Sequence, residues 1–209
     1  MRRRLAIVLG SLIVLTGIAV AAVTRSTTPP IDPGGTVAAR PTSAAAGGDR
    51  IALANLESAM ETLDLIRPPR QKLAEDFTLR TPDGRAIRLS EQRGKVVFIN
   101  FWATWCPPCR EEMPAMERLF ERTKKAGVVM LAVSVDADPK VVTPFLEEHR
   151  FTFTVGLDPK MELANTYGVR ALPASFIVDR EGHLAALAFG PRAWDNAASQ
   201  ALVEGLSRK

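Results

Sequence analysis

The stretch Phe101–Pro114, FWATWCPPCREEMP, contains the only two cysteines of the chain, Cys106 and Cys109. The apolar run Val96–Phe101 leads into this stretch, and residues with helical spacing follow the cysteines. A buried strand that delivers a Cys-x-x-Cys pair to the start of a helix is typical of a redox-active dithiol. The stretch therefore predicts a centre for thiol–disulfide exchange, built on a strand–helix unit.

The residues around the pair suit this chemistry. Exchange requires one thiolate that attacks and a second thiol that releases the mixed disulfide. At a helix amino terminus Cys106 has a lowered pKa, because the helix dipole and free N–H groups favour the thiolate, whereas Cys109 lies one turn further in and can resolve. Pro107 and Pro108 fit the first turn, where no N–H has to donate. Trp105 either offers a flat apolar surface to a substrate or packs in the core.

Other uses of two cysteines are poorly supported. A zinc site needs about four ligands, and the chain adds only His149 and His183, both far from the cysteines in sequence. We therefore predict no metal site and no cofactor besides the Cys106–Cys109 disulfide. A static disulfide across so short a loop adds little stability, although a binding module with such a disulfide remains an alternative. A peroxidase would be expected to show a third cysteine or a dedicated acid pattern.

The amino-terminal segment predicts export. Three arginines, Arg2 to Arg4, precede 19 uncharged residues, Leu5–Val23, and a helix of that length rises about 28 Å, close to the thickness of a bilayer core. We predict a transmembrane anchor over residues 1–23 with the body outside. The alternative is a signal peptide cleaved near Ala19–Ala21. After the arginines the chain has 24 basic against 23 acidic residues, a balance of +1 that gives no reason to expect nucleic-acid binding.

The remaining chain divides by composition. Residues 24–50 are rich in Thr, Pro, Gly, Ser and Ala and predict a flexible linker. Residues 51–69 predict an amphipathic helix packed on the domain, ended by two prolines, with a partner-binding helix as the alternative. Its apolar positions recur every three or four residues: Leu53, Leu56, Met60 and Leu63. Residues 70–209 form the predicted main domain.

Within that domain strands and helices alternate. The expected elements are a hairpin near 77–79 and 87–89, a strand at 96–101, a helix after the cysteines, a strand at 128–135, a helix at 141–149, a short strand at 153–156, a short helix at 161–167, a hairpin at 174–178 and 183–189, and a helix at 194–206. The βαβ portion implies parallel strands with right-handed crossovers, and the hairpins add antiparallel ones. The pattern predicts an α/β fold, a mixed sheet flanked by helices with an added amino-terminal β-hairpin.

Three sequence runs carry a family resemblance. WCPPC, the preceding NFWAT and the later ALPASFIVDREGHL resemble the thioredoxin superfamily. Within it they are most similar to the membrane-anchored TlpA/ResA/DsbE-like thiol–disulfide oxidoreductases. The resemblance covers about residues 73–206 and implies a thioredoxin-like fold. The front helix, the phrase WATWCPPCREEMPA and the late GPRAW resemble TlpA most.

The resemblance also implies roles for single residues. Pro173, after Leu172, matches a cis proline that faces the cysteines and leaves neighbouring backbone groups free to pair with a substrate strand. Glu112 matches an acidic residue near the dithiol, which would raise the thiol pKa values and accept the proton of Cys109. Asn100 stands where cytosolic thioredoxins have a buried aspartate. Because an amide cannot shuttle a proton, that role would pass to Glu112 or water.

The resemblance further implies partners and a location. It implies a domain on the periplasmic side of the inner membrane that reduces client proteins in cytochrome biogenesis: a copper chaperone or oxidase subunit during copper-site maturation, or apocytochrome c. Because the periplasm is held oxidising, such a reductant needs electrons from a membrane thiol donor of the DsbD or CcdA type. A disulfide oxidant or isomerase of the same fold is the alternative, since the redox potential sets the direction.

Overall fold

The computed structural model describes residues 43–208 of the chain. The predicted anchor, residues 1–23, and the predicted linker up to residue 42 lie outside this part. Within the described residues no helix is both long enough and apolar enough to cross a membrane. The architecture below therefore concerns the predicted helix and main domain.

A seven-stranded mixed sheet forms the centre of the domain, with the strand order β2-β1-β5-β4-β3-β6-β7. The strands are β1 (Thr78–Arg80), β2 (Ala86–Arg88), β3 (Val96–Trp102), β4 (Val128–Ser134), β5 (Thr154–Leu157), β6 (Ala174–Val178) and β7 (Leu184–Phe189). β3, β4 and β5 are parallel neighbours, and the other pairings are antiparallel. The predicted mixed sheet and both predicted hairpins are confirmed.

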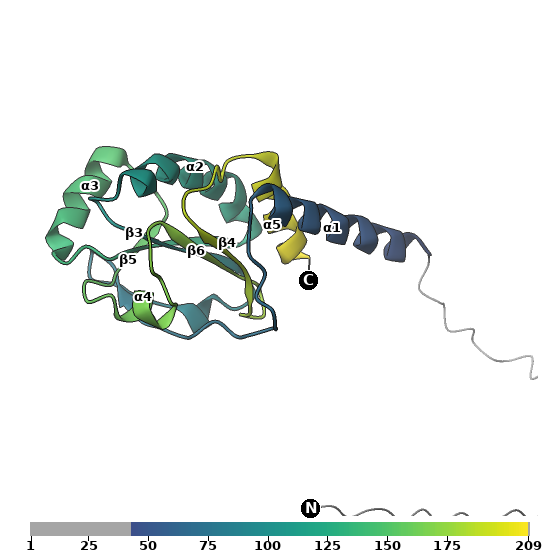
Figure 1. Cartoon of the computed structure of the whole chain (residues 1–209), viewed down its shortest axis with the longest axis horizontal. Helices are drawn as coiled ribbons and strands as arrows, with labels where there is room; N and C mark the ends of the chain where they lie inside the picture. The colour runs from purple at the N-terminus through teal and green to yellow at the C-terminus, as the bar shows by residue number, and fades with distance from the viewer. Residues whose placement is uncertain (1–42, 209) are drawn as a thin grey trace, which may run out of the picture. The chain divides into compact units, whose positions relative to one another are not determined.

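Helices cover both faces of this sheet. They are α1 (Ser43–Thr62), α2 (Pro107–Thr123), α3 (Val142–His149), α4 (Glu162–Thr166) and α5 (Ala197–Ser207). In Figure 1, α2 and α3 lie above the sheet and α4 lies below it. Because both faces are covered, all seven residues of β3 are buried, which explains why this strand is apolar almost throughout.

The register of β3 positions the cysteines. Asn100 lies between Ala132 of β4 and Ser175 of β6, and Phe101 lies opposite Ala174 at the start of β6. β3 therefore ends beside the first residue of β6. The loop that follows β3 carries the dithiol into α2, so residues far apart in sequence meet at this end of the sheet.

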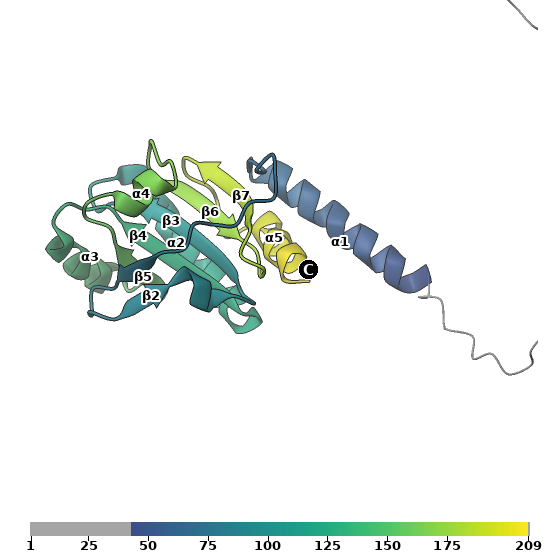
Figure 2. The same ribbon diagram turned by 90° about the horizontal axis from the view of Figure 1, so that it is seen from below.

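Helix α1 differs from its prediction at both ends. It begins at Ser43, inside the stretch expected to be linker, and ends at Thr62. Its buried residues are Leu56, Ala59 and Met60, with Leu63 just beyond the helix. Leu53 is 49% exposed, so its place in the predicted apolar stripe is wrong. Figure 2 shows that α1 runs past α5, the helix that it packs against.

Close packing between α1 and α5 depends on a glycine. A Cβ atom built on Gly205 of α5 would lie 3.0 Å from Cβ of Leu56, which is too close for an ordinary contact. The lack of a side chain at Gly205 therefore lets the two helices approach. This contact holds α1 on the domain, as the sequence predicts for this helix.

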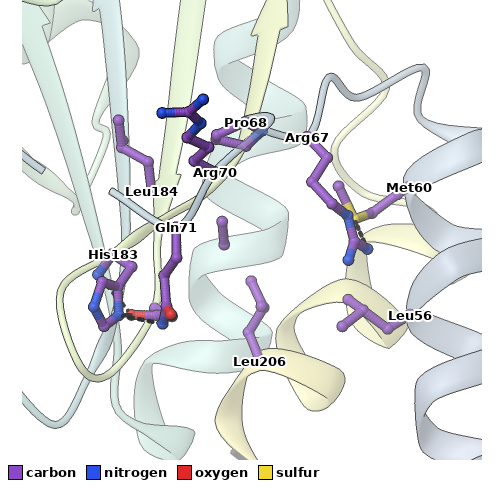
Figure 3. A pocket seen from close by; sticks show the side chains of 11 residues that line it. Leu56, Met60, Arg67, Pro68, Arg70, Gln71, His183, Leu184 and Leu206 are labelled. Carbon is purple, nitrogen blue, oxygen red and sulfur yellow. Dashed lines mark hydrogen bonds and ion pairs between the residues drawn. The ribbon is translucent and has the colours of Figure 1, made fainter. Parts of the chain in front are cut away.

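A cavity of about 330 Å³ lies at the seam between α1 and the domain (Figure 3). Its wall includes Arg67, which donates to Oε1 of Glu57 at 2.6 Å and reaches Sδ of Met60 at 3.0 Å. On the other side Gln71 and His183 lie 3.2 Å apart through their side-chain nitrogens. Neither cysteine lines this cavity, so the redox centre lies elsewhere.

Candidate active site

The two cysteines form a disulfide at the start of α2. Cys106 is the N-cap residue of the helix, and its Cα atom lies 5.3 Å from that of Cys109. Cys106 is 4% exposed, whereas Cys109 is fully buried. The predicted position of Cys106 at the helix amino terminus and the lower accessibility of Cys109 are therefore confirmed. Their separate roles as attacking and resolving thiols stay predictions.

A buried carboxylate holds the loop in front of the dithiol. Asp136, just after β4, accepts hydrogen bonds from the backbone N–H of Thr104 at 3.0 Å and from its hydroxyl at 2.7 Å. The hydroxyl of Ser134 donates to the same carboxylate at 2.8 Å. These bonds orient the residues between β3 and Cys106. The sequence analysis missed Asp136, whose only signal is an acidic residue directly after a buried strand.

Next to Cys106 lies an apolar groove of about 400 Å³. Trp105 borders it and is 67% exposed, so the alternative that this tryptophan packs in the core is wrong. The structure brings together four more of the predicted residues here: Cys106, Pro107, Pro108 and Leu172. The lining is completed by Val135, Met161, Val169, Arg170 and Ala171. An exposed tryptophan above an apolar groove can bind an apolar side chain.

The peptide bond between Leu172 and Pro173 is cis, as the resemblance implies. The carbonyl of Pro173 accepts a hydrogen bond from the N–H of Gly190 at 2.9 Å, so this group is already paired. Between residues 43 and 208, no hydrogen bond involves the backbone groups of the preceding residues 170–172. This segment can therefore pair with an extended peptide lying in the groove.

Glu112 lies in a ring of donors away from the groove. It is 4% exposed. Its Oε1 accepts from Nδ2 of Asn100 at 2.7 Å, and its Oε2 accepts from the N–H of Arg192 at 3.0 Å and from Nε1 of Trp194 at 3.2 Å. The Asn100 amide also donates to the hydroxyl of Ser175 at 2.9 Å. Glu112 thus connects α2 to β3 and to the segment before α5, and Asn100 extends this network to β6.

Burial sets the titration of this carboxyl. It raises the pKa of Glu112 to about 6, although the hydrogen bonds from Arg192, Asn100 and Trp194 act in the opposite direction. At pH 7 such a group is mostly ionised, so it can act as a proton acceptor. The neighbouring Glu111 is exposed, as expected of a solvated charge.

The donors around Glu112 were only partly predicted. The sequence marks Asn100 as a departure from cytosolic thioredoxins and passes its proton-transfer role to Glu112 or water, but no sequence pattern predicts the hydrogen bond between Asn100 and Glu112. Arg192 and Trp194 belong to the GPRAW motif. The similarity of this motif to TlpA did not predict that either residue contacts Glu112. Of Asn100 itself, Oδ1 is buried and has no hydrogen-bond partner among the described residues.

No metal centre is visible within residues 43–208, where no group of three or more His, Cys, Asp and Glu side chains could hold an ion. The two histidines lie apart in the fold. His149 stacks on the ring of Phe145, with 4.1 Å between ring centroids, and His183 lies beside Gln71. Neither takes part in the arrangement around the cysteines.

Comparison with known proteins gives a family match over residues 71–187, to the AhpC/TSA family. The chain is also similar to the thiol-disulfide oxidoreductase ResA of Geobacillus thermodenitrificans, with 46% identity over 110 residues. That alignment covers 52% of this chain and 63% of ResA. The chain thus spans somewhat less than two thirds of the length of this relative.

Solved structures show the same similarity. One is a Chlorobium tepidum protein provisionally named thiol:disulfide interchange protein DsbE, with 36% identity and a TM-score of 0.61 over 66% of this chain and 97% of that one. Another is StoA of Bacillus subtilis, with 28% identity and a TM-score of 0.52 over 63% of this chain and 96% of StoA. The resemblance to TlpA/ResA/DsbE-like proteins is confirmed, and the finer likeness to TlpA stays a prediction.

Proposed function

Because the chain belongs to the AhpC/TSA family and has a thioredoxin-like fold, we propose that it is a thiol–disulfide oxidoreductase that reduces disulfides of client proteins. The observation that carries this proposal is the disulfide of Cys106 and Cys109, placed at a helix start beside an apolar groove. The buried Glu112, three residues further along the same helix, supplies a proton acceptor.

The reaction begins from the reduced dithiol. The Cys106 thiolate attacks one sulfur of a client disulfide, a new bond forms between Cys106 and the client, and the other client sulfur leaves and takes up a proton. Cys109 then loses its proton to Glu112 or water and attacks the sulfur of Cys106. The Cys106–Cys109 disulfide forms, and the second client thiol is released. Two electrons and two protons pass to the client, and the structure contains the oxidised product.

The groove is the surface that positions the client at the dithiol. Trp105, Pro107 and Pro108 border it on the dithiol side, and Leu172 borders it beside the cis Pro173. A client strand can pair with the open backbone of residues 170–172 while an apolar side chain enters the groove. Such pairing would bring the client disulfide to Cys106, the only part of the dithiol that reaches the surface.

The proposed biological role is reduction of client thiols in cytochrome biogenesis, on the periplasmic face of the inner membrane. The proposed clients are a copper chaperone, an oxidase subunit or apocytochrome c, and a membrane thiol donor of the DsbD or CcdA type would return Cys106 and Cys109 to the dithiol. The charge and hydropathy pattern of residues 1–23 supports the location. The similarity of the motifs to the TlpA/ResA/DsbE-like group supports the role.

A mixed-disulfide trap tests this function. Cys109→Ala removes the resolving thiol, so clients attacked by Cys106 should remain attached and can be identified by mass spectrometry from the protein's own cell envelope. The matched control, Cys106→Ser with Cys109→Ala, should capture nothing. Captured copper chaperones, oxidase subunits or apocytochromes support the proposed role. No capture beyond the control contradicts the oxidoreductase itself.

The redox potential separates the proposed reductant from an oxidant or isomerase. Equilibration of Cys106 and Cys109 with glutathione buffers should give a value near that of thioredoxin, about −270 mV. A value near that of DsbA, about −120 mV, would show that the protein installs disulfides. Capture of many unrelated secreted proteins in the mixed-disulfide trap would likewise indicate an oxidant or isomerase.

A further inference from the structure

The groove beside the dithiol contains one charge. Of the ten residues that line it, only Arg170 is ionised, and the others are apolar side chains, prolines and Cys106. Arg170 is exposed. It makes no hydrogen bond or ion pair with any residue in the range 43–208. An unpaired guanidinium at the edge of an apolar surface is a binding position for a carboxylate.

Neighbouring acidic residues do not neutralise Arg170. The carboxylate of Asp136, after β4, is buried and accepts hydrogen bonds from Thr104 and Ser134. Glu162, next to the groove residue Met161, lies 4.0 Å from the ammonium group of Lys160. The positive charge of Arg170 therefore remains available to whatever enters the groove.

We propose that this groove selects client segments that carry a bulky apolar residue and an acidic residue close to the reacting cysteine. The inference rests on the proposed function and adds the chemistry by which clients are chosen. Side chains of an extended client strand alternate in direction. A strand paired with residues 170–172 would place its cysteine at Cys106, an apolar side chain against Trp105, and a carboxylate near Arg170.

Charge argues against an occupant from this chain. Residues 24–42, which precede α1, contain Arg25 and Arg40 and only one acidic residue, Asp32. Their net charge is +1, and they contain no cysteine. A segment of this composition does not complement Arg170, whereas an acidic client does.

The test uses the full chain with Cys109→Ala and four synthetic peptides. Each peptide has one cysteine, activated as a mixed disulfide with a nitrothiobenzoate group, so that attack by Cys106 on the peptide sulfur releases a coloured thiolate. Three peptides have Phe beside the cysteine and differ only in carrying Glu, Gln or Lys at the second position from it. The fourth repeats the Gln peptide with Ser in place of Phe. Second-order rates are measured at low salt.

The Glu peptide should react fastest and the Lys peptide slowest, with a ratio of about tenfold, equivalent to about 1.4 kcal/mol. The ratio should shrink at high salt, because exposed charges are screened, and the Ser peptide should react more slowly than its Phe counterpart. Arg170→Glu should reverse the order. Arg50→Glu changes the net charge equally on α1 and should leave the order as it was.

Two results overturn the inference in different ways. Equal rates for the Glu, Gln and Lys peptides, with adducts on Cys106 in each case, would remove the selection of acidic clients and leave the proposed function intact. If none of the peptides reacts faster with Cys106 than with free glutathione, or if no adduct forms on Cys106, the proposed function fails. The proposed selection of clients then fails with it.

Discussion

Burial and hydrogen bonding act in opposite directions on the pKa of the Glu112 carboxyl. Burial opposes the charge, and three donors from Asn100, Arg192 and Trp194 favour it. The balance leaves a pKa of about 6, close to neutral pH. A carboxyl with this pKa can both accept and return a proton during a thiol exchange.

At the residue scale, the raised pKa predicts a stability change with pH. The pKa of Glu112 rises from 4.5 to about 6 on folding, so protonation stabilises the fold fully below about pH 4.5, and this stabilisation is lost as the pH rises through 6. A shift of this size corresponds to about 2 kcal/mol. Chemical denaturation at about pH 4 and pH 8 should show that loss in the wild type relative to Glu112→Gln.

The exposed neighbour provides the control for this measurement. Glu111→Gln removes a carboxyl one position away that is exposed, and its unfolding free energy should follow the wild-type pH dependence. A Glu112→Gln variant that also follows the wild-type curve would show that Glu112 titrates as an ordinary glutamate.

At the scale of elements, the segment between β7 and α5 joins the amino-terminal helix to the site. The backbone N–H of Arg192 donates to Glu112. Its guanidinium donates to the carbonyl of Leu63 at 2.6 Å and to the carbonyl and carboxylate of Asp64 at 2.9 and 3.0 Å. Arg192 thereby connects the end of α1 to Glu112 of α2, and we expect it to act as a positioning residue.

This connection predicts the effect of removing the guanidinium. In Arg192→Ala the pKa of Glu112 should rise above about 6, because the positive charge of the guanidinium lowers that pKa, whereas the backbone N–H of residue 192 can still donate to Glu112. Stability should fall by about 1–3 kcal/mol, the cost of leaving the acceptors at the end of α1 unpaired. NMR titration of a labelled Glu112 carboxyl measures the first effect, and denaturation measures the second.

Two further variants separate positioning from simple destabilisation. Arg192→Lys keeps the charge but not the two-pronged geometry, so its Glu112 pKa should lie between those of the wild type and Arg192→Ala. Arg67→Ala breaks the ion pair between Arg67 and Glu57 of α1 and should leave the titration of Glu112 unchanged. If Arg192→Ala also leaves it unchanged, Arg192 has only a structural role.

At the scale of the whole molecule, the dithiol, the groove and the cis proline meet at one end of the sheet. Strand β3 delivers Cys106, the end of β4 contributes Val135, and the segment before β6 contributes Leu172 and Pro173. This follows from the strand order, in which β3 lies between β4 and β6. Ligands of open α/β sheets bind at such strand ends.

The proposed anchor predicts where this domain resides. The full chain with a carboxyl-terminal tag should stay with membranes after an alkaline wash, and protease added to intact spheroplasts should remove the tag while a cytosolic marker survives. The apolar run Leu5–Val23 and the arginines before it are the reason. A tag that is cut only after lysis would place the domain inside. A soluble, shortened chain would show a cleaved signal peptide.

Local signals predicted most of the fold. The apolar run at β3, the helical spacing of α2 and the Asp83-Gly84 turn between β1 and β2 depend on residues close together in sequence. The limits of α1 were less predictable. Leu53 belongs to the apolar stripe by spacing but is 49% exposed, whereas Leu56, less than one turn later, is buried. Which residues of such a stripe are buried depends on the tertiary contacts of the helix.

The sequence by itself determined the dithiol, its place at a helix start and, through motif similarity, the cis proline, because each depends on a few adjacent residues. Only the tertiary structure decided the environment of Glu112. Its donors come from residues 12, 80 and 82 positions away, Asn100, Arg192 and Trp194. It also decided that Arg170, which pairs with no side chain among residues 43–208, lines the same groove as Cys106. Contacts over such separations depend on how the strands and helices pack, which no local pattern specifies.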